Sequence, residues 1–111
     1  MTAGGPTPNA QPNSQRGEAS IIIGGRSHIL RPTFAALVAA EEQLGPLFAL
    51  VERAGEGRLA LQEIATLFWH CCQDRGDISQ VQMGDAVMET GLAACSTPLR
   101  SLLQQILQGS A

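Results

Sequence analysis

Residues 20–33 read SIIIGGRSHILRPT, and this stretch sets how the chain begins to fold. Two short runs that favour extended backbone flank Gly24-Gly25, a pair that suits the positive φ angles of a two-residue turn. The stretch therefore predicts a β-hairpin, which is marginal in water and must lie on helices or on another chain. Because successive side chains of a strand point to opposite faces, Ile21, Ile23, His28 and Leu30 would share one face, and Ile22 and Ile29 the other.

The rest of the chain carries helix signals. Pro32 disfavours helix at the residue before it, and Thr33 is a typical N-cap, so a helix should begin directly after it. Glycines then end several apolar-periodic segments, and Ser79 and Thr97 are suitable N-caps for the last two. The predicted helices span residues 34–44, 46–54, 59–75, 80–90 and 98–108. We therefore predict a mainly α fold, with a short N-terminal β-hairpin followed by a compact bundle of about five short helices.

The apolar residues of these helices predict which faces are buried. In the segment 59–75, apolar side chains fill one continuous arc at about 100° per residue, and polar ones fill the opposite arc. The segment 98–108 carries one apolar stripe, formed by Leu99, Leu102, Leu103, Ile106 and Leu107.

The first residues differ from the rest in composition. Residues 1–18 contain, after Met1, no aliphatic or aromatic side chain larger than alanine. Such a segment buries too little apolar surface to offset the entropy of ordering it. We therefore expect a disordered N-terminal tail over residues 1–18 and a single domain over residues 19–109.

Charge and hydropathy exclude several function classes. The formal net charge is −3, the chain has no lysine, and its seven arginines are scattered singly. Nucleic-acid binding usually needs a basic stripe, so we expect no nucleic-acid partner. No apolar run approaches the ~20 residues that span a bilayer, and the N-terminus lacks the pattern of a secretory signal. We expect a cytoplasmic protein without membrane contact.

No pattern of catalytic or metal-binding residues stands out. Cys71, Cys72 and Cys95 lack the spacing of a zinc site. On one continuous helix, the side chains of Cys71 and Cys72 would point about 100° and 200° away from that of His70. The three side chains could not then share a tetrahedral metal. We interpret the three cysteines as small buried apolar residues and His28 as a structural residue. No catalytic residue, metal ligand or cofactor is predicted.

Glu41 does not fit the pattern of its helix. In the segment 34–44, Phe34, Leu37, Val38 and Leu44 define the buried arc, and Glu41 falls inside it. A buried carboxylate without a partner is costly. We therefore predict that Glu41 is a structural buried carboxylate that meets an arginine or caps the N-terminus of a helix.

The segment 80–90 has apolar residues on two sides. Val81 and Met88 lie on one side, and Met83, Ala86 and Val87 lie on another. Such a helix is either enclosed by the core or leaves an apolar patch exposed. On the second interpretation, the candidate partner-binding residues are Met83, Val87, Ile22 and Ile29.

The order of short motifs resembles a known family. The chain has a hairpin with Gly-Gly-Arg, then Leu30-Arg31-Pro32-Thr33-Phe34, the segment 37–41, Leu44-Gly45, Arg58-Leu59, the helical segment 64–69 and Thr90-Gly91-Leu92. This set, over residues 18–108, is similar to the tail-protein family of gene transfer agents and related prophages of alphaproteobacteria. Members are described either as tail tube proteins or as tail assembly chaperones.

The resemblance implies a non-enzymatic role with other tail proteins as partners. A tail assembly chaperone would bind the tape-measure protein, a long helical chain with exposed apolar stretches, and keep it soluble until the tail tube forms around it. The alternative is a structural component of the tail tube, which would remain in the phage-like particle. Whether the chain forms a homo-oligomer stays open.

Overall fold

The hairpin forms at the predicted place and in the predicted register. In the computed structural model, which describes residues 18–109, β1 is Ala19–Ile23 and β2 is Arg26–Leu30. The two strands pair antiparallel, with Ile21 opposite His28. Gly24 and Gly25 both have positive φ, at 59° and 81°, as a tight turn requires. Ile21, His28 and Leu30, which were predicted to share one face, are all buried.

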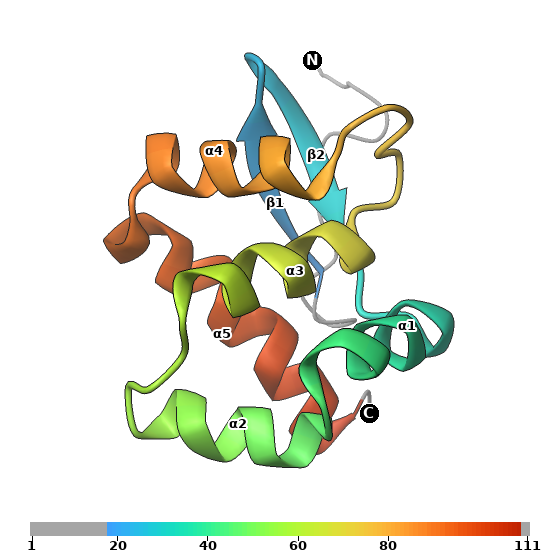
Figure 1. Cartoon of the computed structure of the whole chain (residues 1–111), viewed down its shortest axis with the longest axis vertical. Helices are drawn as coiled ribbons and strands as arrows, with labels where there is room; N and C mark the ends of the chain where they lie inside the picture. The colour runs from blue at the N-terminus through green and yellow to red at the C-terminus, as the bar shows by residue number, and fades with distance from the viewer. Residues whose placement is uncertain (1–17, 110–111) are drawn as a thin grey trace, which may run out of the picture.

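Five helices follow the hairpin within residues 18–109, and the predicted fold class is confirmed (Figure 1). Thr33 caps the first helix through a hydrogen bond from the backbone N–H of Ala36 to its Oγ1 at 3.1 Å. Ser79 caps the fourth helix in the same way through Gln82. The helices are α1 Phe34–Leu44, α2 Leu47–Gly55, α3 Leu61–Cys71, α4 Gln80–Thr90 and α5 Leu92–Gln108.

Two helix ends differ from the prediction by more than two residues. We expected the third helix to continue to residue 75, but α3 ends at Cys71 and Cys72 has extended backbone. We expected the fifth helix to begin at Pro98, but α5 begins at Leu92 and encloses Pro98. Gly91, with a positive φ of 92°, ends α4 and is also the residue from which α5 begins.

Residues after α3 extend the hairpin instead of the helix. The backbone N–H of Arg31 donates to the carbonyl of Cys71 at 2.8 Å, and the N–H of Gln73 donates to the carbonyl of Ile29 at 3.0 Å. Leu30 and Cys72 form an isolated antiparallel bridge between these two hydrogen bonds. Pairing with β2 therefore ends α3, since a residue cannot hold helical and strand backbone at once.

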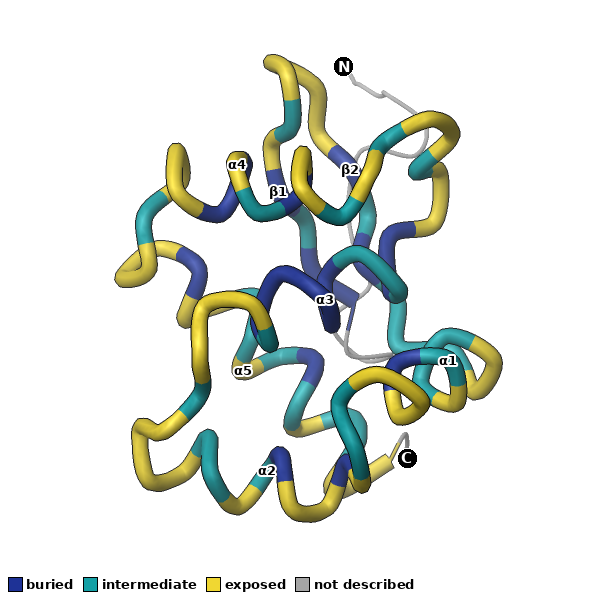
Figure 2. The backbone as a smooth tube through the Cα atoms, in the orientation of Figure 1, coloured by how far each residue is buried: buried dark blue, intermediate teal, exposed yellow. Residues whose placement is uncertain are grey.

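The central helix of the fold is α3. It contacts α1 and α4, while β1 contacts α4 and α5 (Figure 1). Figure 2 shows the dark, buried backbone concentrated on α3. The largest fully buried side chains are Phe68, Leu30, Leu50, Leu67, Met83, Leu102 and Val87.

The structure moves the start of the domain by one residue. Of the expected tail, residues 1–17 lie outside the described part of the chain. Glu18 is described, and it is 5% exposed. Its carboxylate accepts a hydrogen bond from Nε of Arg31 at 2.6 Å. Glu18 therefore belongs with the folded domain.

No single helix within residues 18–109 is long and apolar enough to cross a membrane. Helices α1 and α2 reach that length and composition only when taken together, and the pair is bent by 77° at its break.

Candidate partner-binding groove

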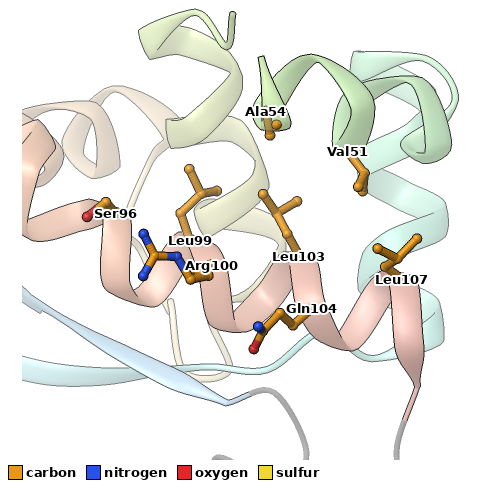
Figure 3. Close-up of a pocket in the computed structure, with 9 residues that line it drawn as sticks. Val51, Ala54, Ser96, Leu99, Arg100, Leu103, Gln104 and Leu107 are labelled. Atoms are coloured by element: carbon orange, nitrogen blue, oxygen red, sulfur yellow. The ribbon is translucent and has the colours of Figure 1, made fainter. Parts of the chain in front are cut away.

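An apolar groove runs between α2 and α5. Its volume is about 320 Å³, and it is open to solvent along one side. Figure 3 shows Leu99, Leu103 and Leu107 pointing from α5 toward α2, where Val51 and Ala54 face them. The remaining lining residues are Gly55, Ser96, Arg100 and Gln104.

The spacing of residues along α5 builds the floor of this groove. Leu99, Leu103 and Leu107 are four residues apart and therefore form one row on the helix surface, about 12 Å long. Leu102 lies beside this row and is fully buried in the core. Leu107 is 55% exposed at the open end of the groove. The apolar stripe predicted for the last helix is thus shared between the core and the groove.

The margin of the groove is polar and carries positive charge. Ser96, Arg100 and Gln104 form the next row of α5 beside the leucine row. Arg100 is the charged residue among those that line the groove. The arrangement suits an apolar helix or strand that carries a carboxylate or carbonyl at its edge.

Helix α2 is positioned by a contact from α1. The backbone N–H of Leu47, in the first turn of α2, donates to a carboxylate oxygen of Glu41 at 3.0 Å. Such an acceptor satisfies one of the N–H groups that a helix start leaves unpaired. The contact connects the end of α1 to the start of α2, and α2 in turn forms one wall of the groove.

Glu41 therefore caps a helix as predicted, but it is exposed rather than buried. The predicted buried arc of the first helix is half wrong: Phe34 and Val38 are exposed, whereas Leu37 and Leu44 are partly buried against the core. The fully buried residue of α1 is Ala40. The segment 34–44 is apolar on most of its surface, so periodicity alone did not determine which side would face α3.

Met83 and Val87 are not accessible for the partner-binding surface proposed from the sequence. Both side chains are fully buried, because α3 and β1 pack against that side of α4. The expected exposure is therefore wrong for these two residues. The other apolar side of α4 is the exposed one, with Val81 at 75% and Met88 at 62% exposure.

The hairpin residues of that proposed surface remain accessible. Ile22 is 52% exposed and Ile29 is partly exposed, both on the outer face of the hairpin. Their role in partner binding stays a prediction. The structure does not join them to Met83 and Val87 in one surface, since the latter two belong to the core.

A second groove, about as apolar as the first, lies between α3 and α4. Leu61, Val81 and Met88 line it together with Asp85 and the uncharged polar residues Gln62, Thr66 and Gln80, and its volume is about 400 Å³. Its charged lining residue is the acidic Asp85, whereas that of the α2–α5 groove is the basic Arg100.

The cysteines are buried, as predicted for small apolar residues. Burial raises the pKa of the Cys71 thiol to about 12 and also raises the pKa of Cys95. A raised pKa leaves little thiolate at neutral pH, and thiolate is the reactive form. Neither residue has the features of a nucleophile.

The family assignment follows from the sequence comparison. Residues 16–109 match the sequence model of the family described as phage tail tube protein, GTA-gp10. The chain belongs to this family. No curated protein and no solved structure matches the chain. The match confirms the resemblance to tail proteins of gene transfer agents and prophages, and it identifies a structural phage tail family.

Proposed function

We propose that this tail protein is a tail assembly chaperone, acting in the cytoplasm, and that the α2–α5 groove receives an apolar helical segment of the tape-measure protein. Membership of the phage tail family supports other tail proteins as partners. The family match does not name a chaperone role or a tape-measure client. Both parts of the proposal rest on the α2–α5 groove.

The observation that carries the proposal is the row Leu99, Leu103 and Leu107 opposite Val51 and Ala54. Helix-in-groove recognition uses apolar side chains of the partner at intervals of three and four residues, which a row of this length accommodates over about two turns. A tape-measure protein offers such segments before the tube encloses it.

The alternative is a structural component of the tail tube, and the family description favours it to the same degree. Tube subunits that pair into rings usually rely on extended β-sheets. Within residues 18–109 the sheet has two strands, apart from the bridge at Cys72. We therefore put the chaperone first. The proportion of the protein in purified particles separates the two: a chaperone is lost during purification, and a tube component is retained in many copies.

The groove is tested by replacing Leu107 with Glu and measuring how much co-expressed tape-measure segment stays soluble. We expect Leu107→Glu to weaken client binding by about 10-fold or more, because a carboxylate in an apolar interface is costly to desolvate. Leu107 is 55% exposed, so the domain itself should remain folded.

Val81→Glu is the matched control. Val81 is 75% exposed and lines the α3–α4 groove instead, so the same charge is introduced at a different apolar surface. It should keep the client soluble. If Leu107→Glu is folded and still solubilises the client, or if Val81→Glu alone abolishes binding, the α2–α5 groove is not the client site.

A further inference from the structure

Three side chains of the metal-ligating types meet beside the hairpin. One ligand atom each of His28, Cys72 and Asp74 lies within 4.8 Å of the other two. Nδ1 of His28 and Oδ1 of Asp74 are 3.0 Å apart. His28 comes from β2, whereas Cys72 and Asp74 follow the end of α3, and Asp74 is 46 residues further along the chain than His28.

Backbone pairing holds these residues together. The bridge between Leu30 and Cys72 and the hydrogen bond from Gln73 to Ile29 set an antiparallel register. Cys72 is opposite Leu30 and diagonal to His28, so its side chain falls on the same face as that of His28. Asp74 follows in a turn, two residues past the bridge, and its side chain contacts His28 directly. The backbone pairing thus brings the three residues together.

We propose that His28, Cys72 and Asp74 form a binding site for a divalent metal ion of the zinc type. Imidazole, thiolate and carboxylate are the three ligand classes that zinc accepts in proteins. Bonds of about 2.1 Å from zinc to nitrogen and oxygen place two tetrahedral ligands about 3.4 Å apart. The separation of 3.0 Å between His28 and Asp74 is close to this value.

The burial of the three residues suits a site with one open side. The His28 residue is 5% exposed and Cys72 is 3% exposed, whereas the side chain of Asp74 is 62% exposed. A hollow of about 400 Å³ adjoins His28 and Asp74 and is also lined by Asp77. An ion could enter from this hollow, which would also supply a water molecule as the fourth ligand.

The local charges act on the Cys72 thiol in both directions. Burial and the charge of Asp74 raise the pKa of this thiol, while a hydrogen bond from the backbone N–H of Asp74 and the charge of Arg75 oppose the rise in part. Binding would release the thiol proton. Arg75 is near, but its guanidinium lies over the Trp69 ring at 4.1 Å and donates to the Trp69 carbonyl. Arg26 also lines the hollow and opposes the ion in part.

Cobalt binding to the full-length protein without an affinity tag tests the site. Co²⁺ replaces zinc in such sites, and its spectrum reports both a thiolate ligand and tetrahedral geometry. We expect one ion per chain, a thiolate-to-cobalt charge-transfer band and displacement by Zn²⁺. Zn²⁺ should also raise the melting temperature of the protein, because it would connect β2 to the segment that follows α3.

The chain supplies matched controls for the cysteine and histidine ligands. Cys72→Ser and His28→Ala should remove the charge-transfer band or weaken cobalt binding by about 10-fold or more, at least the loss caused by an outer-shell change. Cys95→Ser and His70→Ala change the same residue types outside the cluster and should leave binding intact. Asp74→Asn provides a third test if the variants at the buried residues Cys72 and His28 do not fold. The Asp74 side chain is exposed, so this variant should fold, and it should also weaken cobalt binding.

Two results would overturn the proposal. The first is a wild-type protein that gives no charge-transfer band at saturating Co²⁺. The second is a band that survives Cys72→Ser unchanged, or cobalt binding that stays as tight in Asp74→Asn as in the wild type.

Discussion

At the scale of single residues, Arg53 and Glu63 connect the end of α2 to the start of α3. Arg53 donates from both terminal nitrogens to the Glu63 carboxylate, at 2.8 Å and 2.6 Å. Glu63 also accepts from the backbone N–H of Ala60 at 2.9 Å. Ala60 has no side-chain oxygen, so Glu63 alone supplies the side-chain part of this cap. These contacts, that with Arg53 first, lower the pKa of Glu63 from an ordinary 4.5 to about 2.

We predict that Glu63→Gln lowers the melting temperature at neutral pH by about 4 °C or more, because glutamine can still accept from the Ala60 N–H but leaves Arg53 without its charged partner. Because the pKa of Glu63 is lowered in the folded protein, its carboxylate stabilises the fold fully at a pH above the ordinary pKa of 4.5. This contribution is lost as the pH falls through about 2. The difference in melting temperature between wild type and Glu63→Gln should therefore shrink from pH 4.5 down to pH 2, in thermal melts recorded across that range.

Glu56→Gln is the control for this prediction. Glu56 pairs with Arg58 at 3.1 Å, but both side chains are more than half exposed. Exposed pairs contribute little, so this variant should melt within about 2 °C of wild type. Equal effects of the two substitutions would show that Glu63 is an ordinary surface charge.

At the scale of elements, α5 contains a proline that helices normally exclude. Pro98 lies six residues inside the helix Leu92–Gln108. A proline in this place cannot donate the usual hydrogen bond, and its ring crowds the preceding turn, at a cost of about 3 kcal/mol. The turn from Leu92 to Thr97 persists because Cys95 is buried in the core.

We predict that Pro98→Ala raises the free energy of unfolding by about 1–3 kcal/mol in urea denaturation. Pro46→Ala is the control, because Pro46 precedes the first residue of α2 and interrupts no helix; it should change stability little. A loss of stability in Pro98→Ala would instead support a helix that begins at Pro98, as the sequence alone indicated.

At the scale of the whole molecule, the expected tail and the domain differ in what they can bury. Residues 1–17 are poor in apolar side chains, whereas Glu18 is buried and pairs with Arg31. We predict that deleting residues 2–17 leaves the melting temperature unchanged within error, because these residues offer almost no apolar surface to bury. Glu18→Gln should lower the free energy of unfolding by about 1–3 kcal/mol, since Arg31 loses a charged acceptor at a buried position.

Calorimetry on the two variants checks this prediction. A drop of many degrees on deletion would mean that residues 2–17 stabilise the domain. No effect of Glu18→Gln would mean that the contact with Arg31 contributes nothing.

The sequence by itself determined the elements whose signals are local. The Gly24-Gly25 turn and the alternation around it fixed the register of the hairpin, and Thr33 and Ser79 marked the starts of α1 and α4. Turn and cap geometry depends on a few neighbouring residues, so these elements could be predicted within one or two residues. The family was also recognisable from the order of such motifs.

The tertiary structure decided what depends on distant partners. Pairing with β2 ends α3 at Cys71, and packing against α3 and β1 buries Met83 and Val87 rather than the opposite side of α4. For the same reason the sequence placed Cys72 on a helix, where it could not meet His28. Helical periodicity describes the faces of one element, whereas burial and side-chain clusters depend on which other elements pack against each face.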